Sequence, residues 1–273
     1  MNMVKPLNIV FWGEDAFSNV IFSSLIEAGY QVSLVVTPYY DNFVYKRLEL
    51  TCKKNNIPLL RAKKINSEEV CEAVKQAAPD LCVISHFERL IKQPMLEIPP
   101  MGFINLHPSL LPYYRGMAPQ HWPIINGETE AGISVHYVEE QADTGNIIVQ
   151  RRFPLLLDMY VSDLQKVWLE NYKTIMVEAI NNILEGKPTV EQRHLEGSYY
   201  GKLTEEQCQI KPDGSVMQAY NLVRGVSQPY FGARHNNLVI YRAHIYQQGE
   251  GETDKPKIEF NDGVLVADVF KTF

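Results

Sequence analysis

The sequence has no excess of basic residues and no long apolar run. Its 273 residues contain 26 Lys and Arg against 32 Asp and Glu, a formal net charge of −6. Binding of nucleic-acid phosphates rests on a basic surface, so this balance argues against a nucleic-acid-binding protein. No segment approaches the roughly 18–20 apolar residues that span a bilayer, and acidic residues interrupt the start before a signal-like stretch develops. We therefore expect a cytoplasmic protein with no nucleic-acid or membrane partner.

Cysteine is also scarce, and known ligand spacings are absent. The four cysteines are scattered without CxxC or zinc-finger spacing, which favours buried free thiols over disulfides or a metal site. The loop that begins at Gly13 lacks the later glycines of a dinucleotide fingerprint, so NAD or FAD binding is not expected. No HExxH or comparable spacing occurs among the histidines, so no metal is predicted. The histidines outside the candidate site are His86, His121, His194, His235 and His244.

The hydrophobic pattern alternates between strand and helix periods, which predicts an α/β fold. Residues 7–12 form an apolar run of strand length, residues 17–28 have helical spacing, and residues 31–36 resemble a second strand. This order is a βαβ unit, whose strands are parallel and whose crossover is right-handed. Further helical stretches and the strand-like residues 81–85 continue the pattern. We predict a Rossmann-like, mostly parallel sheet flanked by helices.

From about residue 99 the pattern of expected secondary structure changes. Six prolines make residues 99–131 rich in loops, and loops on a rigid sheet often hold functional residues. Strands are expected at residues 133–138 and 147–153. A long helix then follows, with a capping box predicted at Ser162 and Gln165. Short alternating segments beyond it predict a small β-rich C-terminal part. The expected domains are 1–190 and 191–273.

The candidate chemistry lies in FINLHPSLLPYYRG (103–116), where Asn105 and His107 stand two residues apart. On an extended backbone their side chains would share one face, and Asp143 follows in a later turn. An imidazole can accept the proton of an attacking amine, an amide can donate to an oxygen that becomes negative, and a carboxylate can orient the imidazole and raise its pKa. A strand-end histidine satisfied by the backbone is compatible with the same spacing.

These residues belong to a longer set of motifs. The runs NLHPSLLPYYRG, RGMAPQHWPIINGE, GISVHYVEE and ADTGNII resemble the catalytic core of the formyltetrahydrofolate-dependent formyltransferases. The similarity is greatest to the branch that holds methionyl-tRNA formyltransferase and the sugar-nucleotide N-formyltransferases. It is dense over residues 80–155 and loose in the C-terminal part. The resemblance implies that Asn105, His107 and Asp143 are the catalytic set, while His136, at another matching position, is expected to be structural.

The same resemblance implies where the substrates bind. The formyl donor would be 10-formyltetrahydrofolate, a co-substrate, and no metal would be needed. Its expected contacts are Phe87, Glu88, Arg89, Leu90, Val138, Glu139 and Ala142. The expected acceptor contacts are Trp12, Arg115, Arg224 and Tyr230. Aromatic faces stack on bases and guanidinium groups match phosphates. The sequence is equally compatible with core packing for Trp12 and a surface position for Arg115, and for Arg224 and Tyr230 it favours packing within the C-terminal part.

The acceptor amine is predicted from what the C-terminal part could hold. Residues 191–273 contain fewer basic than acidic residues, which disfavours a tRNA acceptor stem. We expect a nucleotide-linked amino sugar, such as dTDP-4-amino-4,6-dideoxyglucose or a related dTDP-4-amino-4,6-dideoxyhexose, used for surface polysaccharide (O-antigen) synthesis. The alternatives are methionyl-tRNA formyltransferase activity and a non-catalytic ligand-binding module on the same scaffold. An apolar C-terminal surface would suit a homodimer.

Overall fold

The computed structural model describes residues 6–192, 196–251 and 253–273. They form two compact units. The first unit contains the chain up to Arg115, together with Ile133–Arg151 and Trp168–Gly197, and the second contains Gly116–Gly132, Arg152–Val167 and Ser198–Phe273. The units therefore interleave along the sequence, whereas the two predicted domains are contiguous.

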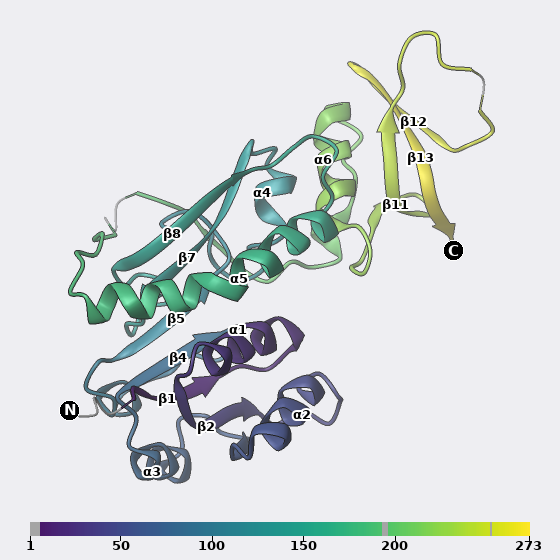
Figure 1. Cartoon of the computed structure of the whole chain (residues 1–273). Helices are drawn as coiled ribbons and strands as arrows, with labels where there is room; N and C mark the ends of the chain where they lie inside the picture. The colour runs from purple at the N-terminus through teal and green to yellow at the C-terminus, as the bar shows by residue number, and fades with distance from the viewer. Residues whose placement is uncertain (1–5, 193–195, 252) are drawn as a thin grey trace. The chain divides into compact units, whose positions relative to one another are not determined.

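The first unit is built on a seven-stranded sheet with the strand order β3-β2-β1-β4-β5-β7-β8 (Figure 1). Its strands are β1 (Asn8–Trp12), β2 (Gln31–Pro38), β3 (Leu59–Ala62), β4 (Leu81–Ser85), β5 (Phe103–His107), β7 (Glu130–Tyr137) and β8 (Ile147–Pro154). Strands β3, β2, β1, β4 and β5 are parallel, and β7 pairs antiparallel with β5. The predicted mostly parallel α/β fold is confirmed.

Helices connect the parallel strands. They are α1 (Ala16–Glu27), α2 (Lys46–Asn55) and α3 (Glu68–Ala77), with a 3-10 turn at Met95–Glu97, and α5 (Val161–Leu184) follows β8. Asp15 caps α1, because its side chain accepts from the Ser18 N–H at 2.8 Å. The predicted capping box of α5 is wrong: Ser162 already lies inside the helix, and the Asp163 carboxylate accepts from the Tyr160 N–H instead.

The central strands supply the core of this unit. Strands β1 and β4 are buried along their whole length, as expected for parallel strands covered on both faces. One core cluster gathers Trp12, Leu34, Cys82 and Phe103 from four strands. All four cysteines of the chain are free and buried, as predicted.

The second unit contains the β-rich C-terminal part. Strands β10 (Ala233–His235), β11 (Leu238–Ile245), β13 (Gly263–Thr272) and β12 (Lys257–Phe260) form an antiparallel sheet, against which α6 (Val216–Val226) packs. The unit also contains α4 (Trp122–Ile125), a 3-10 turn at Glu206–Cys208 and β9 (Tyr199–Tyr200), which pairs with β6 (Arg115–Gly116); of the two β6 residues only Gly116 belongs to this unit. Among the residues described, no helix is both long and apolar enough to cross a bilayer.

Candidate active site

Four polar side chains meet in the first unit, beyond the carboxyl end of β5. Asn105 and His107 lie on β5, and His136 enters because the antiparallel register of β5 and β7 places it opposite Asn105. Asp143 lies in the turn between β7 and β8, which we call the Asp143 turn (residues 138–146). We refer to Asn105, His107, His136 and Asp143 as the polar cluster.

One carboxylate oxygen is the centre of the polar cluster. Asp143 Oδ1 lies 3.5 Å from His107 Nδ1, 3.4 Å from His136 Nε2 and 3.5 Å from Asn105 Nδ2. The side chains of His107 and Asp143 are 6% and 12% exposed, so the polar cluster is largely shielded from solvent, and Asp143 is the more accessible of the two. The structure thus brings together the three residues that the sequence analysis selected, from positions up to 38 apart in the chain.

The hydrogen bonds determine which nitrogen of His107 carries hydrogen. Nε2 lies 2.7 Å from the Tyr114 carbonyl oxygen. A carbonyl can only accept, so Nε2 carries the hydrogen when the ring is neutral, and the lone pair lies on Nδ1. Because Nδ1 faces Asp143, a proton taken up there would lie beside the carboxylate.

His136 is a buried, hydrogen-bonded histidine, as predicted. Its Nδ1 donates to the Tyr137 carbonyl at 2.7 Å, so its Nε2 can accept from the Asn105 amide at 3.2 Å. This contact orients the Asn105 NH₂ group, whose other hydrogen makes the longer contact to Asp143 Oδ1 at 3.5 Å. The sequence analysis did not anticipate that His136 also lies against Asp143.

Burial decides the titration of His107. Loss of hydration lowers the pKa of His107 below its usual 6.5, and the opposing effect of Asp143 is smaller. The expectation that Asp143 would leave this pKa raised is therefore wrong in its net direction. That expectation took into account the attraction between the imidazolium and Asp143. It left out the larger cost of placing a charge on a ring that is buried on all sides. The imidazole is uncharged at neutral pH, which a proton acceptor requires.

Arg115 is buried beside the polar cluster and does not lie on the surface. Its side chain donates to the Asp143 carbonyl oxygen at 3.2 Å and to Gln192 Oε1 at 2.9 Å. The guanidinium is thus committed to the protein and is 8% exposed. The prediction that Arg115 binds a substrate anion is not compatible with this position. Gln192 was missed entirely, because a lone glutamine near a helix end gives no sequence signal.

The residues predicted to contact folate lie in two places on the first unit. The residues 87–90 follow β4, where Phe87 packs edge-on against Trp12 at 5.8 Å between ring centres and Leu90 is exposed. Val138 lies at the start of the Asp143 turn and packs on the same core cluster as Phe87. In this parallel sheet the chain changes direction between β1 and β4, and ligands bind outside the carboxyl ends of strands at such a point.

The other predicted folate contacts are also near solvent. Glu88 and Arg89 are exposed, as is Glu139, whereas Ala142 is half-buried. The Glu88 backbone N–H is already used, since it donates to Glu14 Oε1 at 2.7 Å. Burial raises the pKa of Glu14, whose carboxylate also accepts from the Tyr40 hydroxyl. This bonding joins the loops after β1, β2 and β4.

Two predicted acceptor contacts are corrected. Trp12 has no exposed surface and packs against Phe103, so it belongs to the core and offers no face to a substrate. Arg224 is 1% exposed and donates to the carbonyls of Leu156 and Met159 within the second unit. Its role is to hold a loop by satisfying buried carbonyl groups, and a phosphate cannot reach it.

Tyr230, the remaining predicted acceptor contact, is half-buried in the second unit. Its hydroxyl accepts a hydrogen bond from Gln165 Nε2, and its ring lies edge-on to His121 at 4.3 Å. No group of three or more His, Cys, Asp or Glu side chains suited to a metal ion occurs among the described residues. His194 lies outside the described residues.

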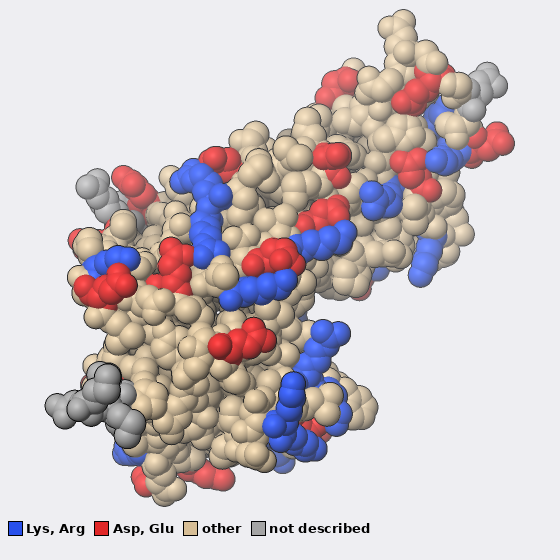
Figure 2. All heavy atoms as spheres, in the orientation of Figure 1, with Lys and Arg blue, Asp and Glu red and all other residues tan. Residues whose placement is uncertain are grey.

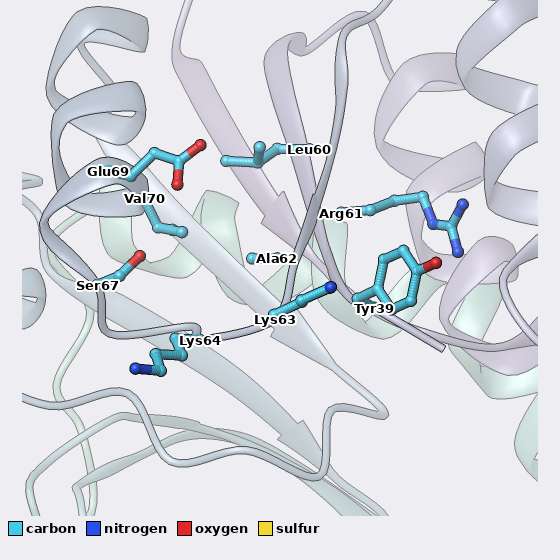
Figure 3. A pocket seen from close by; sticks show the side chains of 9 residues that line it. All are labelled: Tyr39, Leu60, Arg61, Ala62, Lys63, Lys64, Ser67, Glu69 and Val70. Atoms are coloured by element: carbon cyan, nitrogen blue, oxygen red, sulfur yellow. The ribbon is translucent and has the colours of Figure 1, made fainter. Parts of the chain in front are cut away.

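A separate cationic pocket lies at the carboxyl ends of β2 and β3 (Figure 3). It has a volume of about 460 Å³, and its lining includes Tyr39, Arg61, Lys63, Lys64 and Ser67. The Arg61 guanidinium lies over the Tyr39 ring at 4.7 Å, and Lys63 approaches the same ring. None of the predicted site residues lines this pocket. Glu69 also lines the pocket, so three basic side chains and one acidic side chain face it, on the same edge of the sheet as the polar cluster.

Comparison with known proteins agrees with this geometry. Residues 28–180 match the formyl transferase family. Methionyl-tRNA formyltransferase of Ruminiclostridium cellulolyticum is 34% identical over 264 residues, which cover 92% of this chain and 83% of that protein. WlaRD, a sugar 3N-formyl transferase crystallised with dTDP and 5-N-formyl-THF, superposes with a TM-score of 0.76 at 22% identity, covering 97% of this chain and 98% of that one.

A second solved structure is similar to this chain over nearly its whole length. The N-formyltransferase of Helicobacter canadensis, in complex with folinic acid and dTDP-3-aminofucose, superposes with a TM-score of 0.77 at 21% identity. The alignment covers 96% of this chain and 98% of that one. At these identities the two solved structures establish a shared fold.

The fold and the polar cluster define a group-transfer enzyme of the α/β class. The chain belongs to the formyl transferase family. It is a folate-dependent N-formyltransferase, and the two solved structures described above contain 5-N-formyl-THF and folinic acid.

Proposed function

We propose that the enzyme formylates the amine of a nucleotide-linked amino sugar, a dTDP-4-amino-4,6-dideoxyhexose used for surface polysaccharide. The supporting observation is the end-to-end match to two sugar N-formyltransferases, which covers 97% and 96% of this chain and 98% of each of theirs. Both of those proteins were crystallised with a dTDP compound; one is a sugar 3N-formyl transferase and the other holds dTDP-3-aminofucose, so the match supports a dTDP-linked amino sugar and the 4-amino position comes from the sequence analysis alone. The cationic pocket supplies charge for an anionic part of either substrate, the sugar nucleotide or the folate.

A second candidate acceptor is initiator methionyl-tRNA. The relatives at 31–34% identity include several methionyl-tRNA formyltransferases, of which this chain covers 72–87%. On the face shown in Figure 2, scattered acidic and basic side chains are separated by uncharged ones, and Lys and Arg gather over α2. That helix contains Lys46, Arg47, Lys53 and Lys54, and Glu49 forms ion pairs with two of these lysines. A single short helix of this kind gives little of the basic surface that an acceptor stem needs.

The polar cluster supports direct transfer between the two substrates. The unprotonated amine attacks the formyl carbon, and a new C–N bond forms while the formyl oxygen becomes negative. The Asn105 N–H that makes the long contact to Asp143 Oδ1, at 3.5 Å, would turn to donate to that oxygen, and His107 Nδ1 takes the proton of the amine. Asp143 lies 3.5 Å from Nδ1 and stabilises the imidazolium so formed. The C–N bond to the folate then breaks, and the protonated His107 returns its proton to the leaving nitrogen.

The pH dependence of kcat/KM should have two stages. Protonation of the free amine alone gives a slope of about one log unit per pH unit on the acid side. The slope should steepen to about two only below pH 6.5, because burial lowers the pKa of His107 and the ring stays neutral above that value. A rate profile from pH 5 to 9 checks this. Steepening above pH 6.5 would show that the pKa of His107 is not lowered.

The acceptor is decided by a competition assay. We expect the purified enzyme, given 10-formyltetrahydrofolate, to formylate a dTDP-4-amino-4,6-dideoxyhexose with a kcat/KM at least about a hundredfold above that for initiator methionyl-tRNA. Product mass and tetrahydrofolate release would both be measured. The 3-amino isomers serve as matched controls for the position of the amine. Efficient formylation of the tRNA would overturn the sugar assignment and leave the formyl-transfer chemistry intact.

A further inference from the structure

We infer that Arg115 and Gln192 are positioning residues that hold the Asp143 turn against His107. The inference rests on the proposed roles of His107 and Asp143, and it does not depend on which amine is the acceptor. Both residues lie in the first unit, with the polar cluster. Neither needs to touch a substrate.

The Asp143 turn needs an external restraint, because its backbone is strained. Asp143 has φ = 59°, in the left-handed region, which Asp adopts more readily than most residues with a Cβ but still at a cost in free energy. Gly145 passes so close to β7 that a Cβ at this position would lie 2.0 Å from the Tyr137 carbonyl oxygen. A turn in this conformation persists only where surrounding contacts fix it, and a small relaxation would carry the Asp143 carboxylate away from Nδ1.

Arg115 and Gln192 supply these contacts. Gln192 Nε2 donates to two carbonyl oxygens of the turn, to Asp143 at 3.0 Å and to Gly145 at 2.6 Å. Arg115 Nε donates to the same Asp143 carbonyl at 3.2 Å. Arg115 also donates from Nη2 to Gln192 Oε1 at 2.9 Å, so each of the two side chains fixes the other. Gln192 is 2% exposed, which leaves little room for water to replace these bonds.

The same stretch of backbone also fixes His107. Tyr114, the neighbour of Arg115, accepts from His107 Nε2 at 2.7 Å through its carbonyl. Tyr114 itself has φ = 61°. The two adjacent residues therefore hold both partners of the His107–Asp143 pair, one through a carbonyl group and the other through a side chain. The distance between Nδ1 and the carboxylate is set by this arrangement.

The test uses Gln192→Leu, which keeps the size of the side chain and removes its donor. We expect kcat to fall about a hundredfold with KM for both substrates nearly unchanged, as for a reacting group misplaced by about 1 Å. NMR titration of histidine-labelled enzyme should show the pKa of His107 falling further, because Asp143 raises it in the wild type. This second readout needs no acceptor amine. The matched control is Gln76→Leu, at an exposed glutamine of α3.

The outcomes separate the two hypotheses. A wild-type kcat and an unchanged titration of His107 in Gln192→Leu would overturn the positioning role. If the pKa of His107 is lower in Gln192→Leu than in the wild type, but the wild-type enzyme formylates no amine, the positioning role is supported and the proposed function is refuted. If Gln192→Leu does not fold, Arg115→Lys tests the same positioning role. The lysine ammonium cannot donate to both the Asp143 carbonyl and Gln192 Oε1 as the guanidinium does. We expect a partial loss of kcat in that variant, and an unchanged kcat with an unchanged titration would overturn the role.

Discussion

Replacing His107 by asparagine is expected to lower kcat about 10²- to 10⁴-fold, the usual effect of removing a placed base. Asparagine places its amide near the position of Nδ1 and is too short to replace the hydrogen bond of 2.7 Å from Nε2 to the Tyr114 carbonyl. What it lacks is a lone pair of suitable basicity at the position of Nδ1. The measurement is single-turnover formation of tetrahydrofolate with saturating donor and acceptor.

The control for this variant is His235→Asn, a substitution in β10 of the second unit. It should keep the wild-type kcat, and both variants should bind 5-formyltetrahydrofolate with wild-type affinity. A His107→Asn enzyme that turns over at a near-native rate would remove His107 from the mechanism. Lost folate binding in the same variant would point instead to a structural role.

The second large effect is expected for Asp143→Asn, with a fall in kcat that is also about 10²- to 10⁴-fold. Two causes act together. The neutral amide no longer stabilises the imidazolium, and its NH₂ group can donate to Nδ1, which lies 3.5 Å from Oδ1 in the wild type. The lone pair that should accept the proton would then be occupied.

The residual activity of Asp143→Asn distinguishes these causes from simple unfolding. Because Asp143 raises the pKa of His107 against the larger effect of burial, the steep acid limb should move to lower pH in the variant. Asp213→Asn, at an exposed position of the second unit, serves as the matched control. An unchanged kcat in Asp143→Asn would exclude the carboxylate from the transfer step.

The helices and strands were predictable because burial follows the period of each element. The apolar run at residues 7–12 and the helical spacing at 17–28 correspond to β1 and α1. Strand β3 was missed, since it has four residues, three of them half-buried, and exists through pairing with β2. The start of α5 was misjudged because capping by Asp163 depends on local geometry that the spacing of Ser162 and Gln165 does not encode.

Three of the four residues of the polar cluster were selected from the sequence, namely Asn105, His107 and Asp143. The alternation of a strand puts Asn105 and His107 on one side of β5, and the motifs around them single out the family. The partners that lie far away in sequence required the assembled sheet. His136 joins through antiparallel register, and Tyr114 contributes a backbone carbonyl that any residue type could provide.

The sequence by itself determined the α/β architecture, because this depends on the period of the apolar residues. It also indicated the family and the catalytic residues, because several motifs of the chain resemble those of the formyltransferases. Only the tertiary structure decided the net direction of the His107 pKa shift, since desolvation depends on what surrounds the ring on every side. It also decided that Arg115 faces the Asp143 turn and that Trp12 and Arg224 are buried. A side chain's partner is set by packing between distant segments, which a linear pattern does not contain.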